Sequence, residues 1–219
     1  MTTSSAPIKV EIWSDVQCPW CYIGKRKFEA AVEAFDGDVD VEYRSFELAP
    51  DTPVDFEGTA ADYLSQRKGL PADQVQTMLD RVTGIAAQVG LDYRFDDVHQ
   101  TNTVLAHEAL HFAKAHGLQV ELKERLLLAY FTEGRHLGRA EELADLGADV
   151  GLDRDELLAA LGDHRHLADV KADVAQATAY GIQGVPFFVF DGRLGVSGAQ
   201  ETATFADVLA KVRDDRVEA

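Results

Sequence analysis

The amino-acid sequence predicts an α/β fold in which a βαβ unit and a ββα unit frame a long helical segment. Residues 8–13 and 39–46 alternate apolar and polar side chains, as half-buried strands do, and residues 25–35 between them have helical spacing. Residues 59–181 are helix-like almost throughout, with glycines between short amphipathic stretches. Residues 185–190 are strongly apolar, which is typical of a buried strand.

This order of elements is that of a thioredoxin-like core split by a large all-helical insertion. Asp191 and Gly192 predict a hairpin turn into a last strand over 193–196, and residues 201–212 have the pattern of a closing helix. We therefore expect three parts: an N-terminal half of the core (βαβ) over 1–52, the helical insertion over 53–181, and a C-terminal half (ββα) over 182–219.

The chain contains two cysteines, Cys18 and Cys21, placed directly after the first strand and before the first helix. A disulfide between them would close too small a loop to stabilise a domain of 219 residues, because loop-closure stabilisation grows with loop length. A lone Cys-x-x-Cys pair beside a βαβ pattern is typical of redox proteins. Thiol–disulfide chemistry is therefore the leading interpretation.

The helix start predicts different roles for the two sulfurs. Cys18 stands at or near the N-cap, where free backbone N–H groups and the helix dipole favour a thiolate with a lowered pKa. Pro19 suits the first helical position because it has no N–H to leave unpaired. We expect Cys18 to exchange disulfides with substrate and Cys21 to resolve the mixed disulfide. Pro19 and a solvent-facing Trp20 would tune the thiolate and shape substrate contact.

Gly184, Val185 and Pro186 form a second candidate site, at the start of the apolar strand. A proline there is either a trans residue at a sheet edge or a cis residue in a tight loop. With Cys18 in the same fold, we expect the cis form, in a loop that faces the two cysteines. The backbone N–H and C=O of Val185 would then bind an extended substrate segment.

Two sequence patterns offer a metal-binding alternative. Cys-x-x-Cys is half of a zinc site, but no second pair of ligands follows at the usual spacing. His107, Glu108 and His111 match the His-Glu-x-x-His pattern of zinc proteases, but Lys114 replaces the glycine of the longer pattern. We therefore expect no metal site.

The composition limits the classes of partner and the location. With 38 acidic against 21 basic residues, the chain carries a net charge of −17, which opposes binding to nucleic acid or to an anionic membrane. No apolar run is long enough to span a bilayer. Residues 1–7 lack the basic and apolar regions of a secretion signal. We expect a cytoplasmic protein.

Residues 14–24, which contain both cysteines, resemble the active-site segment of the DsbA family of thioredoxin-fold proteins, most closely that of the FrnE-like oxidoreductases. These proteins are in turn similar to 2-hydroxychromene-2-carboxylate isomerases and kappa-class glutathione transferases. Further matching segments lie at 46–50, 102–103, 106–107, 129–134, 181–186 and 198–200. The resemblance covers roughly residues 8–212, and it implies a DsbA-like fold with a nucleophilic Cys18, a resolving Cys21 and a cis Val185–Pro186 bond.

The chain departs from these relatives at three points. It has no second Cys-x-x-Cys pair near the C-terminus, which FrnE-like proteins can carry. It has cysteine at position 18, where the isomerases and transferases typically have serine. Thioredoxins place a buried acid six residues before the first cysteine, but that residue is Ile12 here. Asp15 and Glu47 are the alternatives for accepting the Cys21 proton, and their spacing favours neither.

The predicted function is that of a thiol–disulfide oxidoreductase acting on protein or low-molecular-weight thiols, with no cofactor besides the Cys18–Cys21 pair. Its direction depends on a reduction potential that the motif alone does not determine. Two alternatives stay open: an isomerase or transferase that uses a glutathione-like thiol on a small aromatic compound, and a binding module gated by the redox state. Relatives form homodimers, which leaves a homodimer open for this chain.

Overall fold

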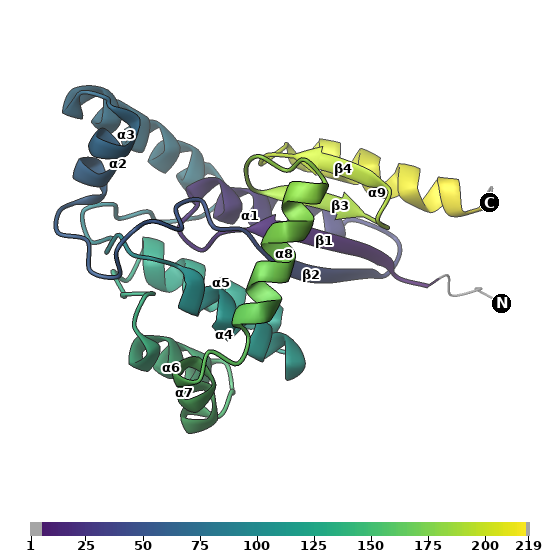
Figure 1. Ribbon diagram of the computed structural model, residues 1–219. Helices are drawn as coiled ribbons and strands as arrows, with labels where there is room; N and C mark the ends of the chain where they lie inside the picture. Colours follow the sequence, from purple (N-terminus) through teal and green to yellow (C-terminus); the bar gives the residue numbers. More distant parts are fainter. Residues whose placement is uncertain (1–5, 218–219) are drawn as a thin grey trace.

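The computed structural model describes residues 6–217, and Figure 1 shows a sheet with helices packed around it and a helical insertion at one side. Residues 1–5 and 218–219 lie outside the described part, and so does most of the segment on which the predicted absence of a secretion signal rests. The elements follow in the order β1 (Ile8–Ser14), α1 (Pro19–Glu33), β2 (Val39–Ser45), α2 (Ala60–Lys68), α3 (Ala72–Gln88), α4 (Val104–Ala115), α5 (Gln119–Phe131), α6 (Ala140–Asp149), α7 (Arg154–Gly162), α8 (Leu167–Ala179), β3 (Phe187–Phe190), β4 (Leu194–Ser197) and α9 (Thr202–Val217).

The sheet has the strand order β2-β1-β3-β4. β1 is parallel to β2 and antiparallel to β3, so that Val10 lies opposite Val41 on one side and Phe190 on the other. β3 and β4 form a hairpin, and its turn residues Asp191 and Gly192 have φ angles of 51° and 66°. Three residues separate the paired Phe190 and Leu194, and the first two have the positive φ angles of a tight hairpin turn. The predicted α/β fold, with a βαβ half and a ββα half around a helical insertion, is confirmed.

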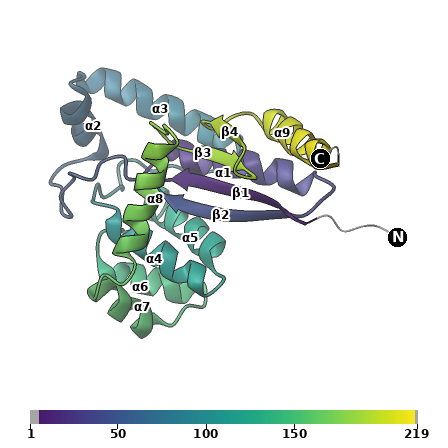
Figure 2. The same ribbon diagram turned by 45° about the vertical axis from the view of Figure 1, so that its right-hand side comes forward.

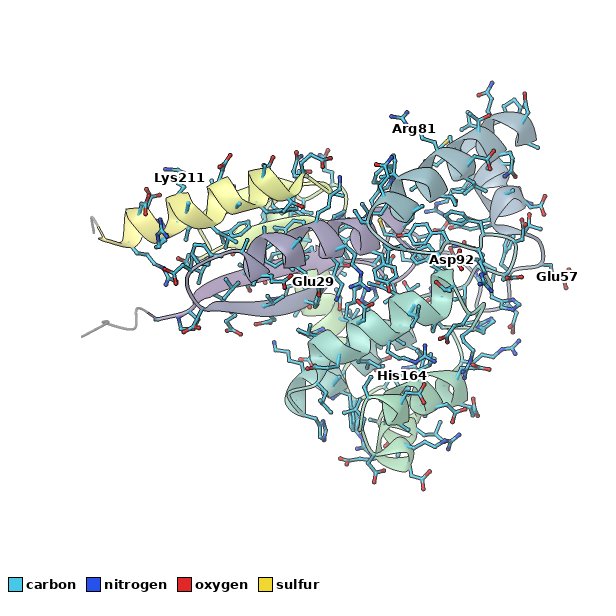
Figure 3. All side chains as sticks on the ribbon, turned by 180° about the vertical axis from the view of Figure 1, so that it is seen from behind. Glu29, Glu57, Arg81, Asp92, His164 and Lys211 are labelled. Atoms are coloured by element: carbon cyan, nitrogen blue, oxygen red, sulfur yellow. The ribbon has the colours of Figure 1, made fainter. Side chains whose placement is uncertain are left out.

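α1 and α9 cover one face of the sheet, which Figure 3 shows from that side. Val10 and Ile12 of β1 point into this core. The ring of Phe28 on α1 lies 5.3 Å from that of Phe188 on β3 and 5.5 Å from that of Phe205 on α9. Because such aromatic packing buries large apolar surfaces, α1 is fixed against the sheet, and with it the cysteine pair at its start.

α8 crosses the opposite face of the sheet (Figures 1 and 2). Trp13 of β1 is fully buried there, and its Nε1 donates to the backbone carbonyl of Asp173 on α8 at 3.1 Å. Arg44 of β2 donates to the Asp173 carboxylate at 3.0 Å and also pairs with Glu11. Because side chains alternate along β1, Val10 and Ile12 pack under α1 and α9 on one face of the sheet. Glu11 and Trp13 point to the other face, where the hydrogen bonds to α8 are made.

The helical insertion has its own apolar core, built mainly from leucine, alanine and aromatic side chains of α3 to α7. Val16, Tyr22 and Ile23 belong to this second core, although they lie in and beside the Cys-x-x-Cys segment. The two cysteines thus stand where the sheet core and the insertion core meet. Within residues 6–217, no helix combines the length and the apolar character needed to cross a membrane.

The two boundaries beside the candidate site compare differently with the prediction. α1 begins at Pro19, as expected from a proline at the first helical position with Cys18 at the N-cap, so the helix includes residues 20–24 before the stretch with clear helical spacing. β3 begins at Phe187 rather than Val185, because the nitrogen of Pro186 carries no hydrogen and cannot join the strand ladder. Val185 and Pro186 therefore lie in the loop before β3.

Candidate active site

Cys18 and Cys21 lie at the N-terminal end of α1. Cys18 is the N-cap residue, with φ −87° and ψ 112°, and Pro19 follows at the first helical position. The backbone N–H of Cys21 donates to the Cys18 carbonyl at 3.0 Å, which closes the turn that brings the two side chains together. Both are free thiols, only 4% and 3% exposed.

The loop before β3 faces Cys18. The Cys18 thiol donates to the carbonyl oxygen of Val185 at 3.5 Å, and the Val185–Pro186 peptide bond is cis. The Pro186 carbonyl accepts from the backbone N–H of Gly198 at 2.8 Å, which ties this loop to the end of β4. The predicted cysteines and the predicted loop therefore meet, and Gly184 lies one residue further back in that loop.

The segment between the cysteines contacts the helical insertion. Trp20 is 40% exposed, whereas Pro19 is half-buried. Tyr93 lies in the loop after α3, and its hydroxyl donates to the Pro19 carbonyl at 2.6 Å. Tyr93 stacks on Phe131 of α5 with ring centroids 4.5 Å apart. The insertion thus holds the backbone of the motif, while Trp20 offers an apolar surface at the rim of the site.

Gly24 of α1 packs directly against the Val185–Pro186 loop. A Cβ at this position would lie 3.0 Å from Cγ of Pro186 and 3.3 Å from Cβ of Ala199. We expect Gly24→Val to push the loop away from Cys18 and to lower the free energy of unfolding by about 1–3 kcal/mol, as overpacking usually does. Urea unfolding and the rate of exchange with oxidised glutathione would measure both effects.

Gly84→Val is the matched control for this substitution. Gly84 is also helical, on α3, but no neighbouring atom lies within 4 Å of the position its Cβ would take. We expect that variant to unfold and to exchange as the unaltered protein does. Equal behaviour of the two valine variants would contradict the packing role given to Gly24.

A buried carboxylate, Asp15, lies between β1 and the cysteines. It accepts from the backbone N–H of Leu48 at 2.9 Å and from the Gln17 amide at 3.2 Å, and it lies 3.5 Å from Nε2 of His107 on α4. Burial opposes ionisation of Asp15, but His107, the Leu48 N–H and the charge of Lys123 outweigh it and hold its pKa below the usual value. Asp15 is therefore an anion at neutral pH.

The two thiols ionise as a pair, because each lies against the other. The hydrogen bond with Cys21, together with burial, raises the pKa of Cys18 well above that of a free thiol. Burial also opposes ionisation of Cys21, but the hydrogen bond with Cys18 and the charge of Lys123 outweigh it and lower the Cys21 pKa. This differs from the lowered Cys18 pKa that the helix start predicts, because the hydrogen bond between the two sulfurs favours ionisation of Cys21 over that of Cys18.

Of the two acids proposed to accept the Cys21 proton, only Asp15 lies in this cluster. Its lowered pKa makes it a poor proton acceptor at neutral pH. Glu47 is half-buried and makes no side-chain hydrogen bond or ion pair within residues 6–217. Neither acid is therefore well suited to accept the Cys21 proton.

Lys123 is a residue that the sequence reasoning missed. It lies on the buried face of α5 and is 1% exposed. Leu122, Leu126 and Leu127 are buried at helical spacing beside it. The sequence does contain a sign of this site. A lysine occupies a position on the apolar face of an amphipathic helix, where a charged side chain is rarely buried without a partner.

The His-Glu-x-x-His residues of α4 have three separate sets of partners. His107 lies beside Asp15, whereas His111 lies 3.0 Å from the Asp173 carboxylate. The Glu108 carboxylate accepts from Nδ1 of His164 at 2.8 Å. Among the described residues, no group of three or more histidine, cysteine or acidic side chains is arranged to hold a metal ion.

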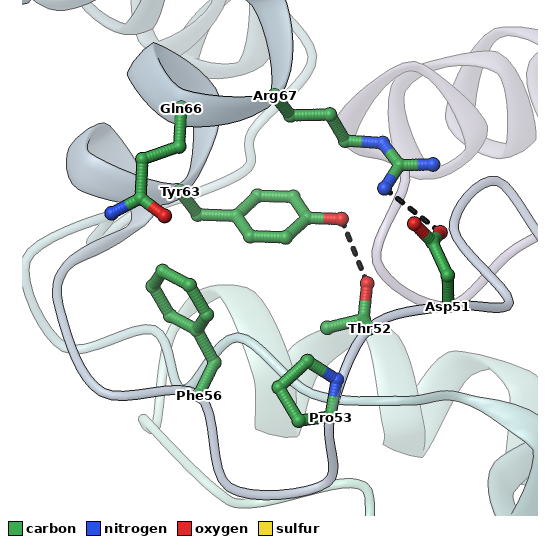
Figure 4. A pocket seen from close by; sticks show the side chains of 7 residues that line it. All are labelled: Asp51, Thr52, Pro53, Phe56, Tyr63, Gln66 and Arg67. Atoms are coloured by element: carbon green, nitrogen blue, oxygen red, sulfur yellow. Dashed lines mark hydrogen bonds and ion pairs between the residues drawn. The ribbon is translucent and has the colours of Figure 1, made fainter.

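A cavity of about 550 Å³ lies between the loop after β2 and α2 (Figure 4). Its walls include Phe56 and Tyr63, and the Tyr63 hydroxyl lies 2.8 Å from that of Thr52. Arg67 closes one side through its ion pair with Asp51 at 2.9 Å. Neither cysteine lines this cavity. The cavity is lined by residues 51–53, close in the chain to Leu48, whose N–H binds Asp15. The cavity is therefore near the cysteine site but separate from it.

A model of the DsbA-like thioredoxin domain matches residues 9–210, nearly the whole chain. The chain belongs to this family. The resemblance drawn from the motifs is thereby confirmed at the level of the DsbA family.

Three known proteins are similar to this chain in sequence or in fold. A probable DsbA oxidoreductase of Streptomyces coelicolor is 38% identical, with a TM-score of 0.89 over 94% of this chain and 90% of that one. An uncharacterized Bacillus subtilis protein, YwbO, is 29% identical over 93% of this chain and 96% of its own length. The cytosolic disulfide reductase DsbM of Pseudomonas aeruginosa, determined with glutathione, shares the fold at 20% identity, with a TM-score of 0.67 over 94% and 99% of the two chains.

Proposed function

We propose that this DsbA-like chain is a thiol–disulfide oxidoreductase that uses the Cys18–Cys21 pair. The observation that carries the proposal is the position of two free thiols at the start of α1, with Cys18 against the Val185 carbonyl. Thiols at a helix N-terminus are stabilised as thiolates by unpaired N–H groups and by the helix dipole. A pair that contains one readily formed thiolate is suited to disulfide exchange.

In the oxidising direction, a substrate thiolate attacks Sγ of Cys18 in the Cys18–Cys21 disulfide. The bond between the two cysteines breaks, a mixed disulfide forms at Cys18, and Cys21 leaves as a thiolate. A second substrate thiolate then attacks the first substrate sulfur, which releases an oxidised substrate and the reduced dithiol. In the reducing direction, Cys18 attacks a substrate disulfide and Cys21 displaces the remaining substrate thiolate.

Access supports Cys18 as the sulfur that meets the substrate. Cys18 lies at the tip of α1, beside the exposed Trp20 and the half-buried Val185. Cys21 lies one turn inside, where the nearby Ser14 and Lys123 are 2% and 1% exposed. The two cysteines themselves are almost equally buried, so it is the exposed surroundings of Cys18 that favour it as the sulfur a substrate meets.

The chemistry proposed here requires no bound cofactor, because the dithiol itself carries the electron pair. Its substrates are protein or low-molecular-weight thiols and disulfides, which the structural likeness to a disulfide reductase determined with glutathione supports. The net charge of −17 disfavours polyanionic partners. A cytoplasmic location, membership of the FrnE-like subgroup and a homodimer stay predictions. Retention of cysteine at position 18 favours dithiol exchange over a serine-type isomerase or transferase.

The reduction potential of the Cys18–Cys21 couple tests the proposal. Purified protein would be equilibrated in glutathione redox buffers, and the alkylated thiols counted by mass. We expect a reversible couple between about −120 and −270 mV, the range of known dithiol oxidoreductases. A pair that resists oxidation, or that binds stoichiometric zinc, would overturn the oxidoreductase assignment. Binding of a partner that depends on the redox state without any turnover would favour the gated binding module.

A further inference from the structure

Lys123 has an unusual environment for a lysine. Five buried side-chain atoms have no hydrogen-bond partner within residues 6–217, and three of them are Ser14 Oγ, His107 Nε2 and Lys123 Nζ. Ser14 precedes Asp15 in the chain, and His107 lies beside the Asp15 carboxylate. Three of the five unpartnered atoms therefore belong to residues whose neighbours are Asp15 and the cysteine pair.

The charged and titratable groups around Lys123 come from three elements and one loop. Its Nζ lies 5.5 Å from the ring centroid of Tyr43 on β2. The other groups whose charges act on Lys123 are Cys18 and Cys21 at the start of α1, Lys25 further along it, and Asp15 after β1. Asp15 is itself contacted by His107 from α4.

A buried ammonium group without a hydrogen-bond partner costs several kcal/mol, so a nearby negative charge must compensate it. Asp15 supplies part of this charge, but its oxygens already bind the Leu48 N–H and the Gln17 amide and face His107. The other groups near Lys123 that can carry a negative charge are Tyr43 and the thiol pair, and burial raises the pKa of Tyr43 well above its usual value, so the thiol pair is the one that can supply the charge. Burial lowers the pKa of Lys123 below that of a free lysine, and the neighbouring sulfurs and Asp15 offset only part of that effect.

We propose that Lys123, supplied by the helical insertion, is a positioning residue whose charge stabilises the Cys21 thiolate. The inference rests on the proposed disulfide exchange, and it gives this chain a substitute for the buried acid that Ile12 replaces. In the resolving step, the Cys21 thiolate attacks Sγ of Cys18 in the mixed disulfide. The Cys18–Cys21 bond forms, the bond to the substrate sulfur breaks, and the substrate leaves as a thiolate that takes up the proton Cys21 had lost. Lys123 keeps its own proton throughout.

The same charge has a consequence for the redox equilibrium. In the disulfide form no thiolate faces Lys123, so its ammonium group is less well compensated than in the dithiol form. Lys123 therefore favours the reduced state and makes the couple more oxidising. Removing its charge should stabilise the disulfide relative to the dithiol.

The test compares Lys123→Met with Lys211→Met. Lys211 lies on α9, far from the insertion (Figure 3), is exposed, and loses the same charge when replaced by methionine. In Lys123→Met we expect the first thiol ionisation, followed by thiolate absorbance in the reduced protein, to move up by at least one pH unit. We expect the equilibrium constant with glutathione to move at least tenfold toward the disulfide, which is about 30 mV for a two-electron couple. Lys211→Met should change neither.

A merely structural lysine would move the thermal stability and leave the thiol titration unchanged, and that outcome would overturn the proposal. A second measurement needs no variant: the pKa of Lys123, read from its side-chain NMR signal, should be lower in the oxidised protein than in the reduced protein. The same value in both states would also overturn the proposal, even if Lys123→Met did not fold. The thiol titration does not depend on catalytic turnover. If the protein catalyses no exchange but shows these shifts, the proposed function is wrong and the role of Lys123 is still supported.

Discussion

Cys18→Ser is expected to lower the rate of disulfide exchange by at least about 1,000-fold, because a serine hydroxyl is not ionised at neutral pH and forms no disulfide. Cys21→Ser should behave differently. Its Cys18 can still attack a disulfide, but no second sulfur can release the product. That variant should therefore accumulate a mixed disulfide when it is mixed with oxidised glutathione, and intact-mass measurement would detect one added glutathione per chain.

The pair of variants also tests which sulfur meets the substrate. The reduced structure lowers the pKa of Cys21 and raises that of Cys18, whereas access favours Cys18. If access decides, only Cys21→Ser will carry glutathione, and peptide mapping will place it on Cys18. A mixed disulfide that forms only in Cys18→Ser would reverse the two roles. Circular dichroism of both variants would serve as the control for folding, since neither substitution changes side-chain volume greatly.

The sequence was sufficient for the fold because its local signals agree with one another. The alternation in 8–13 and 39–46 and the helical spacing after the cysteines predicted a βαβ unit, and the structure has a parallel β1–β2 pair joined by α1. Residues 185–192 predicted a buried strand that enters a hairpin, and β3 turns into β4 there. These features depend on neighbours in the chain, which is why periodicity and turn chemistry find them.

The electrostatics of the candidate site could not be predicted in the same way. Asp15, His107 and Lys123 are far apart in the sequence, and they gather only because α4 and α5 of the insertion pack behind the cysteines. The helix start alone predicted a lowered pKa for Cys18. The hydrogen bond with Cys21, together with burial, reverses that direction, and this bond depends on the separation of two side chains in space rather than on their spacing in the chain.

Asp173→Asn is expected to lower the free energy of unfolding at pH 7 by about 3 kcal/mol, because it breaks a buried charge network. The Asp173 carboxylate accepts from Arg44 at 3.0 Å and from the Ser45 N–H at 2.9 Å, and it lies 3.0 Å from the His111 ring. It thereby joins α8 to β2 and to α4. Asp169→Asn on the same helix is the control, since Asp169 is half exposed and pairs with His166.

The effect of Asp173 should depend on pH in a definite direction. Burial opposes its ionisation, but His111, the Ser45 N–H and Arg44 outweigh burial and hold its pKa below the usual value. A carboxyl whose pKa is lowered by folding stabilises the folded state above its unfolded pKa, near 4, and loses that contribution as pH falls through the lower folded pKa. The difference between Asp173→Asn and the unaltered protein, from urea unfolding, should therefore be largest at neutral pH and shrink in acid. A difference that stays constant between pH 7 and about pH 3 would mean that Asp173 acts through packing and not through its charge.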